Sequence, residues 1–168
     1  MSDNMPHSIE AERAVIGSIL VTPELINDAY VKPKQFYDER LEMIMGYMYL
    51  LHDNFPEAID YTLIANHAGK DLDKIGGIVY LSELASDAPH IVHFKQYQEI
   101  ICETARIRDA MSFMRDQARV GQSANSSASY IEESIQALES LQDDAEKDSS
   151  PVSMFSILKC HDEVIEKR

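Results

Sequence analysis

The sequence predicts an all-α protein, and three observations support this fold class. Hydrophobic residues make up 45% of the 168 residues and charged residues 26%, which is the balance of a globular chain. Glycine and proline number only 6 each, too few for the turns that an all-β chain needs. Apolar residues recur at helical spacings along most of the chain. We therefore expect a globular head of short helices, followed by a long antiparallel helical hairpin, a linker and a short linker helix.

We expect the head over residues 1–92. Serine and aspartate accept backbone N–H groups at helix starts, and proline fits the first turn because its missing N–H is not needed there. Glycine ends helices because it adopts left-handed dihedral angles without strain. The predicted helix starts and stops are Ser8, Thr22-Pro23, Asp38, Asp60, Gly69, the Gly76-Gly77 turn and Pro89.

The first expected helix, SIEAERAVIGSIL over residues 8–20, carries a carboxylate inside its apolar face. Glu12 falls among isoleucine, valine and leucine side chains, and an unpaired buried charge is too costly to keep. We expect Glu12 to be at least partly buried and paired with Arg106 or Arg108, Arg106 being the first choice, because a guanidinium can form two parallel bonds to a carboxylate. The alternative is a first-turn glutamate that the helix dipole holds at the surface.

The hairpin is expected over residues 93–145. A long helical pattern runs from about His93 to Val120, the segment 121–127 breaks it, and a second long helix follows. Ser129 and Glu132 have the spacing of a capping box. The expected stripes are Tyr97, Ile101, Ala105, Met111, Met114 and Ala118 on the first helix and Ile131, Ile135, Leu138 and Leu141 on the second. Because each stripe has only one partner helix, we expect apolar surface to remain for another chain.

The last part of the chain is expected to be a docking element. Residues 146–152 are charged and serine-rich and predict a linker, and residues 153–168 predict a short amphipathic helix. Phe155, Leu158 and Ile165 lie on one side of that helix. An apolar helix held away by a linker favours docking on a partner. The alternative is that it folds back onto its own domain.

The charge of the chain excludes some classes of function. The formal net charge is −14 and no basic stripe is present, so we expect no direct binding of nucleic acid by this segment. The two cysteines are far apart, which favours reduced thiols. No secretion signal and no apolar run of the ~20 residues that span a bilayer occurs, so we expect a cytoplasmic protein without membrane contact.

The sequence contains no convincing catalytic, cofactor or metal site. Gly69-Lys70 lacks the upstream glycine and the following serine or threonine of a phosphate-binding loop. His90 and His93 have no evident third ligand for a metal. In the run Cys160 to Glu163, consecutive side chains point in different directions around a helix. We therefore expect this chain, taken alone, not to be an enzyme.

Five segments carry a family resemblance. They are PHSIEAERAVIGSIL, the FY of KQFYDE, AIDYTLI, IGGIVYLSEL and YQEIICETARIRDAM. In this order and spacing they resemble the N-terminal domain of DnaB-type replicative DNA helicases, which bacteria and phages both encode. The resemblance extends over essentially the whole chain and implies a helical head, a hairpin and a linker helix that leads into an ATPase domain.

The resemblance implies a non-catalytic domain that pairs through its hairpin, as a dimer or weak higher oligomer. Such pairs form a collar on a hexameric ring and dock the primase C-terminal domain and the helicase loader. The implied interface residues are Met111, Met114, Ile131, Ile135 and Leu138. Phe155, Leu158 and Ile165 would anchor the linker helix on the neighbouring subunit's ATPase domain.

No Walker motif occurs in this sequence, so the resemblance implies a fragment of a longer ATP-dependent helicase. ATP and magnesium are implied only for the missing ATPase domain. The alternative is a free-standing helical adaptor or inhibitor that regulates a replicative helicase. The residues that follow Arg168 in the gene would discriminate, since a stop codon there favours the adaptor.

Overall fold

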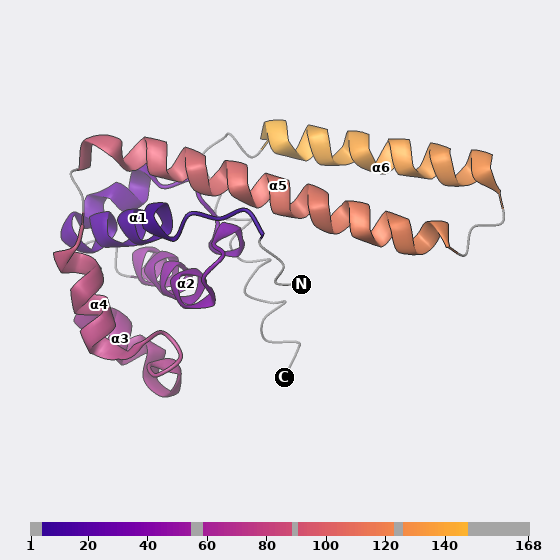
Figure 1. The fold of residues 1–168 in the computed structure, drawn as a ribbon. Coiled ribbons are helices and arrows are strands. Elements are labelled where there is room, and N and C mark those ends of the chain that lie inside the picture. The colour runs from indigo at the N-terminus through magenta and orange to yellow at the C-terminus, as the bar shows by residue number, and fades with distance from the viewer. Residues whose placement is uncertain (1–4, 55–58, 89–90, 123–125, 148–168) are drawn as a thin grey trace. The chain divides into compact units, whose positions relative to one another are not determined.

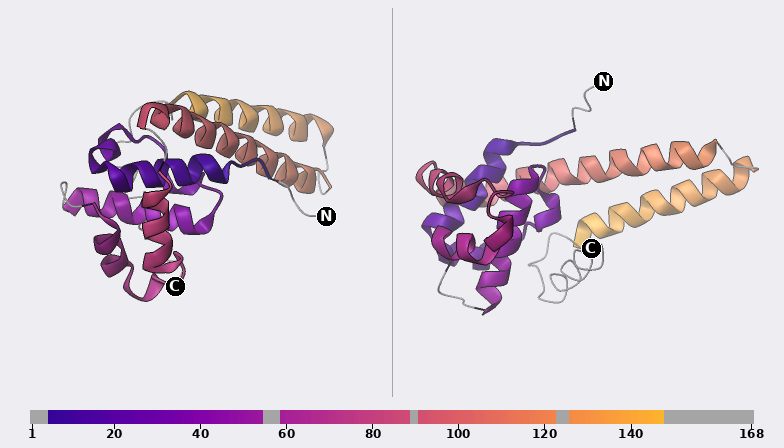
Figure 2. Two further views of the ribbon diagram at one scale, coloured as in Figure 1. Left: turned by 60° about the vertical axis from the view of Figure 1, so that its left-hand side comes forward. Right: turned by 90° about the horizontal axis from the view of Figure 1, so that it is seen from below.

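A computed structural model describes residues 5–54, 59–88, 91–122 and 126–147, which are helical with no strand among them (Figures 1 and 2). The α-helices are α1 (Ile9–Val21), α2 (Glu39–Asn54), α3 (Tyr61–Ala68), α4 (Gly77–Ser86), α5 (Phe94–Gly121) and α6 (Ser127–Lys147). The 3₁₀-helices are η1 (Pro23–Asp28), η2 (Pro33–Gln35), η3 (Gly69–Asp71) and η4 (Ile91–His93). The predicted all-α class is confirmed. No helix in these ranges is long and apolar enough to cross a membrane.

The chain forms two compact units that divide within α5. The head unit is His7–Ala105, and the described part of the hairpin unit is residues 5–6, 106–122 and 126–147. The first turns of α5 therefore belong to the head, whereas the sequence analysis placed the boundary at residue 92. The physical reason is burial, because Phe94, Ile101 and Ala105 pack inside the head unit.

The core of the head unit lies among α1, α2, α3 and α4. Helix α1 packs on α4 and α2, and α3 packs on α2 and α4. Long aliphatic side chains fill the space between them and exclude water, which is the main source of stability for such a unit. The largest fully buried side chains are Ile16, Ile19, Leu41, Ile44, Met45, Met48, Leu51, Ile59, Ile64, Ile75, Leu81 and Leu84.

Local hydrogen bonds explain where the head helices begin and end. Each of three predicted cap side chains accepts a backbone N–H within the next turn: Ser8 from Ala11, Asp38 from Arg40 and Asp60 from Leu63. Gly69 ends α3 at a φ of 49°, which an L side chain rarely adopts. These predicted starts and this stop are confirmed. A helix also begins at Thr22-Pro23, as predicted, and it is the 3₁₀-helix η1.

A buried glutamine holds the segment between η1 and η2. Gln98 of α5 is fully buried, its Oε1 accepts the Tyr30 N–H at 2.8 Å, and its Nε2 donates to the Asp28 carbonyl at 3.3 Å. The buried Tyr49 hydroxyl donates to the Val31 carbonyl at 2.9 Å. Burial raises the pKa of Tyr49, so the hydroxyl stays a donor. Two side chains thus provide hydrogen-bond partners for the backbone N–H and carbonyl groups of an irregular segment.

Replacing Gln98 with alanine is expected to lower the free energy of unfolding by about 2 kcal/mol, because the Tyr30 N–H loses its acceptor. Urea unfolding of the chain, followed by circular dichroism, measures this loss. Gln96→Ala is the control, since Gln96 is exposed on the same helix and its loss is expected to cost less than about 0.5 kcal/mol. Equal effects of the two variants would contradict the proposed role of Gln98.

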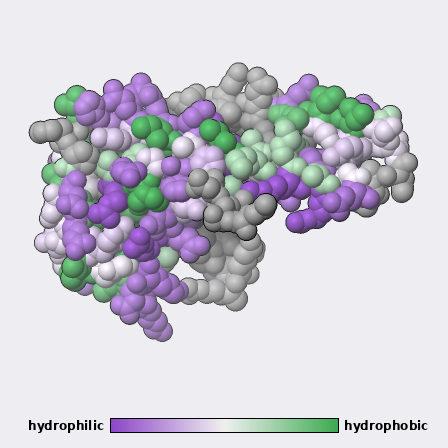
Figure 3. All heavy atoms as spheres, viewed as in Figure 1, coloured by the Kyte–Doolittle hydropathy of each residue, from purple (hydrophilic) through white to green (hydrophobic). Residues whose placement is uncertain are grey.

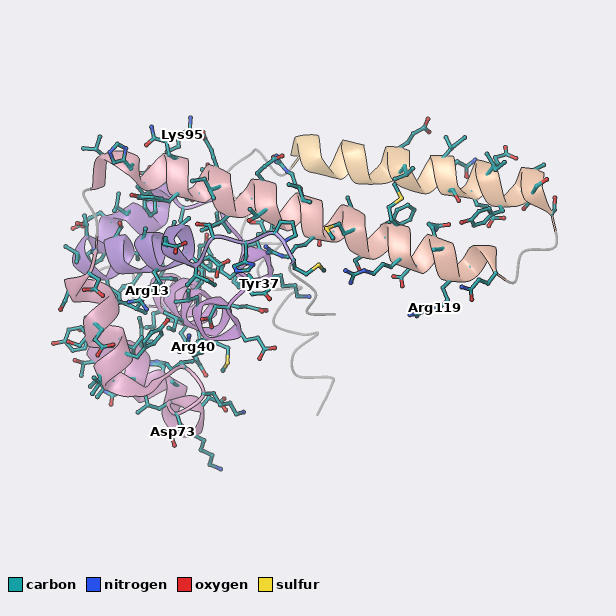
Figure 4. The ribbon with its side chains drawn as sticks, in the orientation of Figure 1. Arg13, Tyr37, Arg40, Asp73, Lys95 and Arg119 are labelled. Carbon is teal, nitrogen blue, oxygen red and sulfur yellow. The ribbon has the colours of Figure 1, made fainter. Side chains whose placement is uncertain are left out.

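A cluster of charges and one aromatic ring joins three helices at the surface of the head unit. The guanidinium carbons of Arg13 and Arg40 lie 5.5 and 4.7 Å from the centre of the Tyr80 ring. Arg40 also pairs with Asp38 at 2.6 Å, and Arg13 pairs with Asp87 at 3.2 Å. Figure 4 labels the two arginines. The hydrogen bond from Arg40 holds the pKa of Asp38 below its usual value. This contribution to stability is present at neutral pH and is lost as the pH falls through that lowered pKa.

Candidate subunit interface

The second half of α5 and α6 run antiparallel, side by side, within the hairpin unit (Figures 1 and 2). The Tyr130 hydroxyl donates to the Gln117 carbonyl at 2.8 Å, and the Ser134 hydroxyl lies 3.1 Å from Gln117 Oε1. The Tyr130 ring lies over Gly121, where a Cβ would meet ring atoms at 2.9 Å. Polar contacts and one ring thus hold the two helices together, and the predicted antiparallel hairpin is confirmed.

The start of α6 differs from the predicted capping box. The helix begins at Ser127, and the Ser126 hydroxyl oxygen accepts the Ser129 N–H at 3.5 Å. The Ser129 hydroxyl donates to Glu133 at 2.8 Å. The prediction of a box formed by Ser129 and Glu132 is therefore wrong, because a serine nearer the loop occupies the capping position.

The hairpin unit lacks a buried core among the side chains that the structure describes, since all of them are half-buried or exposed. Its apolar side chains instead lie on an open surface, and Figure 3 shows apolar residues exposed on the hairpin. We call this surface the apolar face, and it consists of Ile107, Met111, Met114 and Ala118 on α5 and Ile131, Ile135 and Leu138 on α6. All five hairpin residues that the sequence analysis assigned to an interface belong to it.

A shallow groove runs along the apolar face between the two helices. It is lined by Phe113, Met114, Gln117, Ala118, Tyr130, Ile131, Ser134, Ile135 and Leu138. Met114 and Ile131 are each 55% exposed and Ile135 is 51% exposed. A contiguous apolar surface of this kind is typical of a site that binds another protein surface.

The predicted stripe on the first hairpin helix combined two different faces. Ile101 and Ala105 are buried in the head unit, whereas Met111 and Met114 lie on the open face. Sequence reasoning missed Ile107, which is 42% exposed. The spacing of 107, 111, 114 and 118 follows the alternation of four and three residues of a heptad seam and is the signal that would have found it.

Glu12 is buried, with 1% of its surface exposed. Its Oε1 accepts the Tyr37 N–H at 2.8 Å and its Oε2 accepts the Asp38 N–H at 3.1 Å. These amides precede the first turn of α2, where the helix dipole favours a negative charge. Sequence reasoning missed these partners, because it does not tell which loop approaches α1. Glu12 and Arg106 belong to different units, and their ion pair stays a prediction.

Helix α6 extends to Lys147, so residues 146 and 147 are helical and the predicted linker cannot begin at 146. The other linker residues and the helix expected over 153–168, with Phe155, Leu158 and Ile165, lie outside the described residues. Across the described residues, no group of three or more His, Cys, Asp or Glu side chains is arranged to hold a metal ion.

Comparison with known proteins identifies relatives of this chain. Residues 4–103 match the family model described as the DnaB-like helicase N terminal domain. The chain is 33% identical over 107 residues to the replicative DNA helicase DnaB of Geobacillus stearothermophilus. It is 31% identical over 106 residues to the replicative DNA helicase DnaC of Bacillus subtilis. Each match covers 61% of this chain and 23% of the relative, so the chain spans about a quarter of these helicases.

Solved structures share the fold. The N-terminal domain of DnaB helicase from Mycobacterium tuberculosis superposes with a TM-score of 0.72 at 22% identity, covering 81% of this chain and 98% of that one. A DnaB-like replicative helicase, described together with its interactions with primase, gives a TM-score of 0.68 at 28% identity, covering 95% and 36%. Since the family model matches more than half of the residues, the chain belongs to the DnaB-like helicase N-terminal domain family.

Proposed function

We propose that this chain joins the subunits of a hexameric replicative DNA helicase into a collar and docks primase and loader there. The observation that carries the proposal is the apolar face of a hairpin unit whose described side chains are all half-buried or exposed. Burying this face against another hairpin would provide the hydrophobic stabilisation that the unit does not obtain alone. The relatives of this chain are named replicative DNA helicases, and this supports a role in DNA replication.

The docking of primase is proposed from a structural relative. That relative is a DnaB-like helicase described with its interactions with primase, and this chain superposes on it over 95% of its length. We propose that the primase C-terminal domain binds the collar formed by this domain, and that a helicase loader uses the same collar.

The helix expected over 153–168 would dock on the neighbouring ATPase domain through Phe155, Leu158 and Ile165. ATP, magnesium and DNA unwinding would belong to that ATPase domain, in the cytoplasm.

Sedimentation equilibrium of the purified chain tests the self-association. The wild type is expected to form dimers or higher oligomers as its concentration rises. Met114→Glu and Ile135→Glu place a carboxylate in the apolar face of each copy, and we expect each to raise the dissociation constant roughly 50-fold or more. A wild type that stays monomeric at high concentration would contradict the proposal.

A matched control tests whether the effect is specific to the apolar face or follows from placing a charge at any exposed apolar residue. Val79 on α4 is 68% exposed and belongs to the head unit, so Val79→Glu introduces the same charge elsewhere and is expected to leave the oligomer unchanged. Titration with an isolated primase C-terminal domain tests the second role. Failure to bind at any oligomeric state would remove primase docking from the proposal and leave self-association standing.

A further inference from the structure

Helix α5 continues from the head unit into the hairpin unit without a break (Figure 1). Its buried residues end at Ala105, and the next residue, Arg106, is the first of α5 that belongs to the hairpin unit. Most of the stability of a helix in a protein comes from the packing of its side chains on neighbouring elements. Helix α5 is therefore less well supported from the boundary between the two units onward.

Thr104 weakens the helix at the same place. Its hydroxyl donates to the carbonyl oxygens of Ile100 and Ile101, one turn earlier, at 3.0 Å each. A threonine hydroxyl that bonds these carbonyls competes with the backbone N–H groups of the helix, and such contacts often bend helices. The boundary between the two units is thus the point at which we expect α5 to bend.

The chain crosses this boundary a second time, between Pro6 and His7. We call residues 5–7 the N-terminal clasp. On the hairpin side, Arg108 donates to the Pro6 carbonyl at 2.8 Å, and Arg115 Nη2 lies 3.5 Å from the Met5 sulfur. A hydrogen bond from a charged donor is stronger than one between neutral groups. The clasp is therefore attached to the first turns of α5 beyond the boundary.

On the head side, the N-terminal clasp is attached to the loop before α2. The His7 ring stacks on the Tyr37 ring, with the ring centres 4.1 Å apart and the ring planes 8° from parallel. The Tyr37 N–H is itself bound by the buried Glu12 carboxylate at 2.8 Å. The next residue, Ser8, caps α1 by accepting the Ala11 N–H. Each end of the clasp is thus attached within its own unit.

A second connection across the boundary restricts bending because the N-terminal clasp is short. Three extended residues reach about 10 Å at most. A bend of α5 changes the separation between points on the two sides of the boundary. As long as Arg108 holds Pro6 and Tyr37 holds His7, a three-residue connection allows only a narrow range of such separations.

We propose that residues 5–7 form a clasp that limits the bending of α5 at the boundary between the head unit and the hairpin unit. While the clasp is attached on both sides, the hairpin moves with the head; when either attachment is lost, α5 bends and the hairpin moves separately. This inference goes beyond the proposed function, and it holds for one chain whether or not the chain self-associates.

Pulsed electron paramagnetic resonance tests the clasp by measuring distances between two spin labels in one chain. Val79→Cys in the head unit and Gln136→Cys in the hairpin unit provide exposed attachment sites. Cys160→Ser removes a competing thiol, and Cys102, which is 6% exposed, is shielded from the label. Labelled chains are diluted into an excess of unlabelled chains, so that distances between chains do not contribute.

A chain that lacks residues 2–6 is expected to give a distance distribution roughly twofold wider than the wild type, because the hairpin then moves relative to the head. A chain that lacks residues 2–4 is the matched control, since it is also shortened but keeps the N-terminal clasp. Its distribution is expected to have the wild-type width. Circular dichroism checks that both chains keep their helices.

Substitution of His7 tests the clasp in the full-length chain. His7→Ala removes the ring that stacks on Tyr37 and is expected to widen the distribution. His7→Phe keeps a ring that can stack and is expected to restore the wild-type width. A chain without residues 2–6 whose distribution is as narrow as the wild type would overturn the inference. Equal widening in the chain without residues 2–4 would also overturn it, because the effect would then not belong to residues 5–7.

Discussion

Replacing Glu12 with alanine is expected to lower the free energy of unfolding of the head unit by about 3 kcal/mol. Glu12 is 1% exposed, and its two carboxylate oxygens accept the N–H groups of Tyr37 and Asp38 at the start of α2. The alanine variant leaves both amides without this acceptor and opens space in a packed region. Since a domain of this size has about 5–15 kcal/mol of stability, such a loss is severe. Urea unfolding followed by circular dichroism measures it.

Glu12→Gln distinguishes the charge from the shape of the side chain. Glutamine has one oxygen, so its amide N–H₂ would face one of the two backbone donors, and we expect a loss of about 2 kcal/mol. Glu10→Gln is the control, because Glu10 is exposed in the same turn of α1 and its replacement should cost less than about 0.5 kcal/mol. A Glu12→Gln variant as stable as the wild type would contradict this role of the Glu12 carboxylate.

A double-mutant cycle tests the predicted ion pair with Arg106. Arg106→Met alone and combined with Glu12→Gln gives the coupling free energy between the two side chains. If the guanidinium reaches the carboxylate, we expect a coupling above about 0.5 kcal/mol. If the losses of stability in the two single variants simply add in the double variant, the predicted ion pair with Arg106 is contradicted. The two backbone amides and the α2 dipole then account for the stabilisation of Glu12.

The parts of the fold that depend on neighbouring residues could be predicted from the sequence. Ser8, Asp38 and Asp60 cap their helices within one turn, and a glycine at a positive φ ends α3, so the required information lies within a few residues. The same holds for the break between α5 and α6, where a polar and glycine-containing segment interrupts two long helical patterns.

The parts that depend on distant residues could not be predicted. The partners of Glu12 are amides 25 and 26 residues away, and no sequence period encodes the approach of that loop. Helix α5 packs into the head with Phe94 and Ala105 and then presents Met114 on another face. A single stripe drawn along the whole helix therefore merges two surfaces, and only the packing of the head separates them.

Gly17 illustrates close packing that the sequence analysis did not detect. It is buried in the middle of α1, where a glycine weakens a helix relative to alanine. The reason for glycine is the approach of α4. A Cβ at position 17 would overlap the carbonyl oxygen of Leu84 and lie 3.3 Å from the Cβ of Ala88. Because the obstacle is backbone, no side-chain rotation can relieve the overlap, and α1 and α4 must move apart.

Gly17→Ala is therefore expected to lower the free energy of unfolding by about 2 kcal/mol, since separating two packed helices costs more than the gain in helix propensity. Gly46→Ala is the matched control. Gly46 lies inside α2, and a Cβ there would have nothing within 4 Å, so the same substitution should stabilise the protein by about 0.5–1 kcal/mol. If the m-values are unchanged, the urea denaturation midpoint should fall for Gly17→Ala and rise for Gly46→Ala. A Gly17→Ala variant as stable as Gly46→Ala would mean that α4 does not approach α1 through this glycine.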